Sequence, residues 1–502
     1  MQGSRLFALI LLLAPVVFLS SPGTPVLEGV VQTDAGLPIA RASVRRQGHA
    51  ACTRSNETGR FQLPPGSGPI TATKPGYRIG SVSSDTMALR IKLARLPAED
   101  NDNYSWIAPD RDAGKPNNCG NCHHEINREW AGSAHSQSSQ NRKFLALLDG
   151  TDGTLPPRRD WNLGVQHPEG AGVCVNCHAP TFQDSTLAYD FRSIKDTAAR
   201  GVHCDYCHKI AAAPTDKLGT RFGRDGYPIL RPADGDLLSL GPLDDAIRPG
   251  ESFAYAPFYK ESRYCASCHE GVIFGVHVYG TYSEWLDSPA KRAGRQCQTC
   301  HMAPTGTMTN IAPGHGGIER DPKSLASHAL PGGTPEMLRK CLTLKVQVDR
   351  GQEQTKVATL LRADNVGHRV PTGFIDRHLI LVIEAWDAKG QRVASVAGPK
   401  LVAAAGSELA GQAGWLYAKK LTSEGRSPLP FWLPPDGMSD TRLHPDQPDR
   451  REFTFPSNAT VFRARLFYRR FWAETAEPFK WGDNDVIVVE RRSVLGRTMN
   501  PP

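Results

Sequence analysis

A five-residue pattern, Cys-X-X-Cys-His, occurs five times in the middle of this 502-residue chain. The pattern is the attachment signature of c-type haem, in which two thiols bond to the porphyrin and the next histidine is held beneath the iron as its proximal ligand. The sequence therefore predicts five covalently attached c-type haems. The attachment cysteines are Cys119, Cys122, Cys174, Cys177, Cys204, Cys207, Cys265, Cys268, Cys297 and Cys300, and the proximal histidines are His123, His178, His208, His269 and His301.

Zinc ribbons are the main alternative for repeated Cys-X-X-Cys pairs. A ribbon needs two such pairs for each ion and gives no reason for a histidine after every second cysteine, so haem is favoured. Of the 12 cysteines, the motifs leave only Cys52 and Cys341, which rules out a disulfide framework as the main source of stability. Cys52 is expected to be a buried thiol rather than half of a disulfide.

Residues 98–340, which contain the motifs, are expected to form a pentahaem domain rich in short helices and loops. Gly and Pro are frequent there, and helical patterns are short, as at Glu125 to Trp130 and Asn141 to Leu148. Such a segment cannot bury enough aliphatic surface by itself. We therefore expect the porphyrins to supply its core and the apoprotein to be unfolded in this region.

The two flanking regions alternate apolar and polar residues with a period of two, which predicts strands. Residues 25–97 contain several short runs of this kind, separated by Gly and Pro. In residues 341–502 the alternation is clear at Leu342 to Val348 and at Phe462 to Tyr468. The predicted fold class is thus multidomain: an N-terminal β-sandwich, a central helical and loop-rich pentahaem cytochrome domain, and a C-terminal β-sandwich.

Residues 1–24 resemble a secretory signal peptide, with Arg5 followed by an apolar run from Leu6 to Leu19. The run is short for a membrane span, although an uncleaved anchor stays open as an alternative. No later segment is long and apolar enough to span a bilayer, and the mean hydropathy is -0.39. We expect an exported protein, periplasmic or at the cell surface, with no membrane span in the mature chain.

The formal net charge of +8 does not indicate nucleic-acid binding. The Lys and Arg residues are scattered rather than gathered in one stripe, and each haem brings two propionates that need cationic partners. We therefore interpret these residues as propionate partners and solvated surface.

Eleven histidines remain after the proximal ligands are assigned, enough for histidine on both sides of every iron. Methionine is a poor alternative, because Met302 directly follows its own motif and most others lie in the β regions. His203 precedes Cys204 directly, so it can serve only a neighbouring haem, while His368 lies in a turn of the C-terminal region and would make that region part of the haem core. His124, His167 and His378 stay undecided, and His49 and His444 are not expected to ligate iron. The predicted distal ligands are His135, His203, His277, His315, His328 and His368.

Residues 25–97 resemble the carboxypeptidase regulatory-like domain. The resemblance implies a transthyretin-like sandwich without catalytic residues, of the kind that serves as a spacer or adhesion unit in exported proteins. It is carried by Gly29, Val31, Asp34, Gly36, Pro38, Ala42 and Val44, then Thr58, Gly59, Phe61, Leu63 and Pro64, and finally Pro75, Gly76 and Tyr77.

The central segments resemble the multihaem cytochrome family that includes hydroxylamine oxidoreductase and its tetrahaem electron acceptor. The resemblance covers about Asn117 to Gly333 and implies closely packed haems, mostly ligated by two histidines. The chain departs from it in having five motifs rather than four or eight. Each motif ends in His, so the lysine-ligated catalytic haem of pentahaem nitrite reductase is absent. The sequence segments that carry this resemblance are CHHEINREWAGSAH, GVHCDYCHKI, YCASCHEG with GTYSEWLDSP, and CQTCHMAP. The GHRVPTG turn resembles a tail found on some exported multihaem cytochromes.

The leading hypothesis is an exported electron-transfer protein, with no catalytic residue assigned. Its expected partners are redox proteins, namely a quinol-oxidising membrane complex and other cytochromes, and chains can also associate haem to haem. The alternative is an oxidoreductase in which one haem keeps an open position and acts on a nitrogen or sulfur compound or a peroxide. A mainly adhesive role is a third, weaker hypothesis. Groups near the fourth motif that would suit an open haem are Arg263, Tyr264, Tyr279 and Tyr282.

Overall fold

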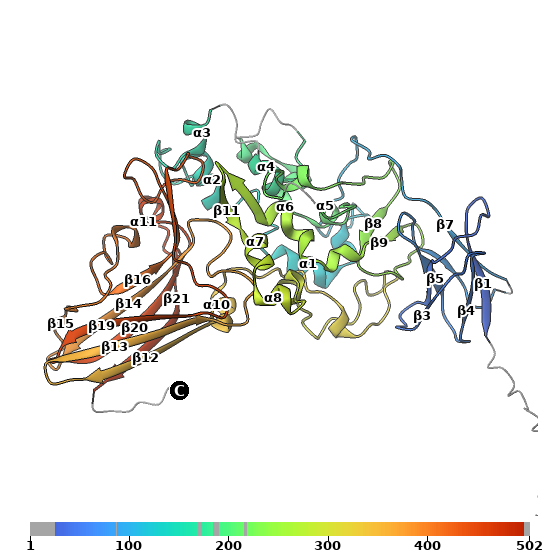
Figure 1. The fold of residues 1–502 in the computed structure, drawn as a ribbon. Helices are drawn as coiled ribbons and strands as arrows, with labels where there is room; N and C mark the ends of the chain where they lie inside the picture. The colour runs from blue at the N-terminus through green and yellow to red at the C-terminus, as the bar shows by residue number, and fades with distance from the viewer. Residues whose placement is uncertain (1–25, 87, 169–172, 184–189, 215–217, 496–502) are drawn as a thin grey trace, which may run out of the picture. The chain divides into compact units, whose positions relative to one another are not determined.

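The computed structural model describes residues 26–86, 88–168, 173–183, 190–214 and 218–495 (Figure 1). The predicted signal peptide lies outside these residues. The chain divides into two compact units, one comprising the residues up to Lys74 with Gly80–Ala94, and the other comprising Pro75–Ile79 with Arg95 onward. Within the described ranges, no helix is long and apolar enough to cross a membrane. The chain is thus multidomain, with many β-sheets around a helical and loop-rich central region.

The first unit consists of two small sheets. One has the order β4-β1-β7 and the other the order β3-β2-β5-β6, and β1 pairs antiparallel with β4 but parallel with β7. Alternate residues such as Val31, Val44 and Ile91 are fully buried, as the period-two pattern predicts. The expectation of a buried Cys52 is wrong, because this thiol is exposed at the start of an edge strand. The strands are β1 (Leu27–Thr33), β2 (Ser43–Arg46), β3 (Cys52–Arg54), β4 (Arg60–Leu63), β5 (Ile70–Thr73), β6 (Gly80–Val82) and β7 (Leu89–Leu93).

The central part of the second unit has short helices, and four of the α-helices described overlap a haem motif. The two helices predicted from the sequence are present as α1 (His124–Ala131) and α2 (Arg142–Asp149). α2 begins at Asn141, whose side chain accepts hydrogen bonds from Lys143 N and Phe144 N, and it ends at Gly150 in the left-handed conformation. The other helices are α3 (Leu163–Gln166), α4 (Val173–His178), α5 (Cys204–Cys207), α6 (Ala266–His269), α7 (Thr281–Leu286), α8 (Pro289–Arg292), α9 (Cys297–His301) and α10 (Pro335–Cys341).

Two short strand pairs in this central part were not predicted. β8 (Leu238–Gly241) pairs in parallel with β9 (Ser252–Tyr255). β10 (Glu270–Ile273) begins directly after the fourth motif and forms an antiparallel hairpin with β11 (Val276–Gly280). Strand β11 leads directly into the next helix, α7, so the hairpin determines the path of the chain after the fourth motif.

The C-terminal part contains two larger sheets that share one apolar core (Figure 1, orange to red). One sheet has the order β12-β13-β19 and the other β15-β14-β20-β21, with β16 also paired to β14. Leu344 and Val357 of the first sheet meet Leu381 and Leu466 of the second in this core. These strands are β12 (Leu342–Arg350), β13 (Gln354–Ala363), β14 (His378–Asp387), β15 (Arg392–Val393), β16 (Gly414–Tyr417), β19 (Pro448–Pro456), β20 (Ala459–Arg469) and β21 (Asp485–Val494), and a separate pair is formed by β17 (Lys419–Thr422) and β18 (Gly437–Asp440).

Strand β14 is buried on both faces, which joins the C-terminal sheets to the haem-motif region. Its first eight residues are all buried. Leu381 faces the core between the two sheets, while Ile380 and Val382 pack in a second core with Leu145 of α2 and Trp161. Burial on both faces explains why this strand is a continuous apolar run rather than an alternating one.

Candidate haem sites

One cavity of about 1560 Å³ runs through the region of the motifs, and every motif contributes to its wall. All ten motif cysteines and all five motif histidines line it, although the motifs are spread over some 180 residues of sequence. Pockets for single small molecules usually measure about 300–1,000 Å³, so this space suits several large groups rather than one. The wall between the motifs is largely aromatic and aliphatic, with Trp130, Phe144 and Trp285 among its residues.

Four of the five proximal histidines are oriented by backbone carbonyl groups. A carbonyl oxygen can only accept, so each of these rings carries its proton on Nδ1 and leaves the Nε2 lone pair free for a metal. Burial lowers the pKa of His178 and His208 and so favours the neutral, ligating form. The Nδ1 bonds run from His123 to Ile311 O (2.8 Å), from His178 to Ser138 O (2.9 Å), from His208 to Leu240 O (2.7 Å) and from His301 to Pro331 O (2.6 Å).

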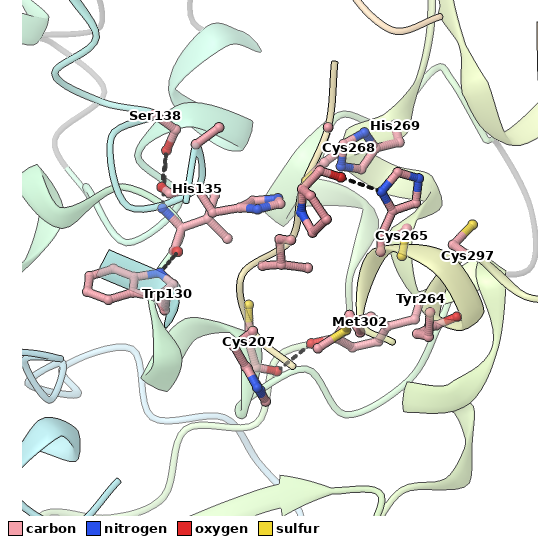
Figure 2. A pocket seen from close by; sticks show the side chains of 18 of the residues that line it. Trp130, His135, Ser138, Cys207, Tyr264, Cys265, Cys268, His269, Cys297 and Met302 are labelled. Carbon is pink, nitrogen blue, oxygen red and sulfur yellow. Dashed lines mark hydrogen bonds between the residues drawn. The ribbon is translucent and has the colours of Figure 1, made fainter. Parts of the chain in front are cut away.

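Two proximal histidines face a predicted distal histidine at the separation expected across an iron atom. A metal–imidazole bond is about 2.0–2.1 Å long and the bonded nitrogen lies about 1.1 Å from its ring centre, so two rings on opposite faces of one metal have centroids about 6.3 Å apart. The His135 and His269 centroids are 6.1 Å apart, and those of His301 and His368 are 6.3 Å apart. Figure 2 shows His135 and His269 on the wall of the same cavity, with Cys265 and Cys268 near His269.

The protonation states of these rings also fit metal ligation. Burial, reinforced by neighbouring histidines, lowers the pKa of His135 to about 4 and that of His269 to about 3. Burial likewise lowers the pKa of His368, whose Nδ1 donates to Arg369 O at 2.9 Å. His135 Nδ1 is buried and has no partner among the described residues. The donors present therefore suit c-type haem: paired thiols for the porphyrin and neutral imidazoles for the iron.

His203 and His328 also line the cavity, as predicted for distal ligands. His203 is fully buried, with Nε2 at 3.2 Å from Thr181 Oγ1 and no partner for Nδ1 in the described part of the chain. His328 is held by its backbone N, which donates to Glu129 Oε2 at 2.7 Å. The nearby rings of His208 and His123 disfavour a positive charge on the His328 ring and so lower its pKa. Burial lowers the pKa of each ring to about 4.

The other two predicted distal ligands, His277 and His315, do not line this cavity. His277 lies on β11 with a half-exposed side chain, and its Nδ1 is 2.5 Å from Oε1 of the buried Glu270. The His315 ring instead lies 6.0 Å from that of His124, which is exposed at the start of α1. Their ligation of iron stays a prediction that the geometry of the described residues does not support.

Thiols of different motifs lie close enough to affect each other's pKa, which identifies the motifs that are neighbours in space. A hydrogen bond with the Cys268 thiol, together with burial, raises the pKa of Cys177. The Cys119 thiol and burial likewise raise the pKa of Cys204. The Cys297 thiol and burial raise the pKa of Cys265. The first motif is therefore adjacent to the third, the second to the fourth, and the fourth to the fifth.

Of the residues named for an open haem, the three tyrosines line the cavity and Arg263 does not. Arg263 instead pairs with Glu261 at 2.5 Å. Tyr264 donates to Cys207 O at 3.0 Å, as Tyr259 does at 2.7 Å, so these two hydroxyls fix the third motif. Tyr259 and the carbonyl groups that orient the proximal rings were missed from the sequence, because nothing local marks a residue as the partner of a distant motif.

Comparisons with known proteins agree with this arrangement. The profile of the family described as cytochrome c554 and c-prime matches residues 118–209, which include the first three motifs. Among solved structures, the chain is similar to a penta-heme cytochrome c552 from Thermochromatium tepidum, with 20% sequence identity and a TM-score of 0.55 over 75% of this chain and 97% of that chain. At this identity the likeness shows a shared fold.

A second solved structure, the ApaA protein from Bordetella pertussis, aligns with 31% of this chain and 95% of its own at 14% identity and a TM-score of 0.15. No curated protein matches the chain significantly. The family match, the shared fold and the motif-lined cavity together support a multihaem c-type cytochrome with covalently bound haem.

Proposed function

We propose that the protein is an exported pentahaem c-type cytochrome that passes electrons one at a time between redox partners. The observation that carries the proposal is the single cavity lined by all five Cys-X-X-Cys-His motifs. Haem supplies reversible one-electron chemistry, and the protein sets each potential through axial ligands, burial and nearby charge. The neighbouring motifs form two groups, one and three, and two, four and five. Tyr264, which directly precedes the fourth motif and donates to Cys207 O, joins the two groups, so all five haems would lie close enough for such transfer.

The ligation that we propose is histidine on both faces of most irons. His135 is assigned to the haem of the fourth motif and His368 to that of the fifth, because each faces the corresponding proximal ring at the expected separation. His203 and His328 are assigned to neighbouring haems of the same cavity. His277 and His315 keep the role predicted from the sequence only if their rings turn toward the haems when these are attached.

The partners and location are proposed on chemical grounds. Multihaem c-type cytochromes are typically exported, so we place the protein in the periplasm or at the cell surface. A quinol-oxidising membrane complex would deliver electrons and another cytochrome would accept them, with contact between haems of two chains as a further route. The N-terminal unit, with its resemblance to carboxypeptidase regulatory-like domains, would act as a spacer.

Spectroscopy of the purified, oxidised protein tests this function. A carrier in which two protein side chains ligate each iron, histidines in most cases, gives a purely low-spin ferric spectrum that cyanide does not change, and its reduced form does not bind carbon monoxide. A high-spin fraction that binds these ligands would instead support the oxidoreductase acting on a nitrogen or sulfur compound or a peroxide. The two hypotheses thus predict opposite results from one sample.

A further inference from the structure

Glu284 connects the haem-motif region to the turn that carries His368. It lies on α7, and its side chain is 9% exposed. Oε2 accepts hydrogen bonds from Arg369 N at 3.2 Å and from Thr372 Oγ1 at 2.6 Å. Oε1 lies 2.8 Å from a guanidinium nitrogen of the buried Arg442. One carboxylate therefore holds both ends of the segment 369–372.

The remaining groups of that segment are held by residues around Glu284. Val370 exchanges two backbone hydrogen bonds with Leu443, each 3.0 Å long. Arg442 donates to Pro371 O at 3.2 Å while its other nitrogens bind Asp440 at 2.9 and 2.7 Å. Every residue that follows His368 as far as Thr372 thus has a fixed hydrogen-bond partner.

This segment determines where the His368 ring lies. His368 Nδ1 donates to Arg369 O, the carbonyl of the same residue whose N–H is bound by Glu284. On the other side of His368, Gly367 approaches the haem-motif region so closely that a Cβ there would lie 3.2 Å from Ala290 Cβ and 3.3 Å from Trp285 Cδ1. The ring is then 6.3 Å from His301, with the two planes 19° apart.

We propose that Glu284 is the positioning residue for the distal ligand of the fifth haem. This inference rests on the proposed function, since it takes His368 as that ligand. Residues that orient a metal ligand commonly change metal affinity by about 10–100-fold when they are replaced. Loss of the Glu284 carboxylate frees Arg369 N and leaves Thr372 Oγ1 with Thr281 Oγ1 alone, at 3.0 Å. It also leaves Arg442 without one of its two anionic partners. The His368 turn then moves and the fifth iron loses its sixth ligand for part of the time.

The test compares Glu284→Ala, Thr372→Val and His368→Ala in the full-length, haem-loaded protein. Thr372→Val removes one of the two hydrogen bonds to Glu284 but keeps the buried ion pair with Arg442. The control is Glu336→Gln, which breaks an exposed ion pair with Lys340 on α10. The measurements are haem content by intact mass, the number of high-spin haems by electron paramagnetic resonance, carbon monoxide bound per chain after reduction, and recovery of the low-spin signal on addition of imidazole.

We expect His368→Ala to convert one haem to a high-spin form that binds carbon monoxide and that imidazole restores. Glu284→Ala should give the same species in a substantial fraction of chains, Thr372→Val in a smaller fraction, and Glu336→Gln in none. A general change of fold would open more than one haem, whereas loss of positioning opens the fifth haem alone. If Glu284→Ala loses haem altogether, Thr372→Val decides the outcome.

Two results overturn the inference in distinguishable ways. If His368→Ala opens one haem but both Glu284→Ala and Thr372→Val keep every haem low-spin, Glu284 is not a positioning residue and the proposed function stands. If His368→Ala itself leaves every haem low-spin, His368 is not the ligand and the inference loses its basis. Fewer than five haems in the unmodified protein would contradict the proposed function itself.

Discussion

The imidazole rings of His135 and His269 lie 6.1 Å apart, with their planes at 71° to each other. His269 belongs to the fourth motif, whereas His135 follows α1 in the segment after the first motif. The backbone of His135 is fixed by Ser138 Oγ and Val202 N, which donate to its carbonyl oxygen at 2.9 and 3.0 Å. The segment between the first and second motifs is thus held so that its histidine lies beside the proximal histidine of a motif much later in the chain.

Replacing His135 by alanine is expected to open the haem of the fourth motif. Without the imidazole the iron keeps only His269, so one haem per chain should become high-spin and bind cyanide or carbon monoxide. Optical titration of the loaded protein measures this. His49→Ala, which removes an exposed ring in the first unit that is not expected to ligate iron, is the control and should leave the spectrum unchanged. A His135→Ala protein that stays entirely low-spin would rule out the assignment.

Removing the attachment thiols of the fourth motif should lose one haem and weaken the neighbouring sites. Cys265 and Cys268 lie near thiols of the fifth and second motifs, so the fourth haem is expected to pack against both neighbours. We expect Cys265→Ala with Cys268→Ala to reduce the intact mass by one haem and to lower the unfolding temperature. Cys52→Ser, which changes an exposed thiol in the first unit, should alter neither quantity. Loss of a haem from Cys52→Ser would contradict the assignment of the motifs.

A buried ion pair supports the third motif. Asp205 and Lys209 flank His208, and their side chains are 3% and 1% exposed, with Oδ1 and Nζ 2.5 Å apart. Asp205 Oδ2 also accepts from Tyr104 Oη at 3.0 Å and from Ile107 N at 2.9 Å. Asp205→Asn leaves Lys209 buried with its charge unpaired, so we expect a loss of about 3–5 kcal/mol in stability. Urea unfolding followed by haem absorbance measures it.

The matched control for this pair is Glu125→Gln, which breaks the exposed pair with Arg128 on α1. Exposed pairs contribute about 0–1 kcal/mol, so this variant should unfold almost as the unmodified protein does. Equal losses of stability in the two variants would show that burial of the Asp205–Lys209 pair does not add to its contribution.

The C-terminal sheets should lose stability in acid through Glu384. Burial opposes ionisation of this carboxyl, but Arg463, Arg465 and Arg392 outweigh it and hold its pKa below the usual value. The unfolded chain then binds the proton more readily than the folded chain. The stabilisation is therefore complete above the unfolded pKa of about 4.3 and is lost as the pH falls through the lower folded pKa.

Glu384→Gln should accordingly cost about 1–3 kcal/mol at neutral pH and much less in acid, where the unmodified carboxyl is also neutral. Thermal unfolding of both proteins between pH 3 and pH 7 checks this dependence. A cost that stays constant over that range would show that the charge of Glu384 is not the source of its effect.

The sequence predicted the motifs, the two helices α1 and α2, and most long strands, because each depends on local spacing or periodicity. It also selected His135 and His368, whose neighbours suggested contact with a haem. It did not predict the hairpin β10–β11, which turns His277 toward Glu270 and away from the cavity. Nor could it identify Glu284 as a partner of Arg369, because contacts between residues so far apart in the chain leave no local pattern.

The central claim is that all five motifs carry covalent haem around one cavity. Intact mass spectrometry of the purified, exported protein, combined with iron and zinc analysis, tests it most directly. We predict the mass of the processed polypeptide plus five haems, with five iron atoms and no zinc per chain. A mass that corresponds to fewer than five haems, or zinc in place of iron, would contradict the account.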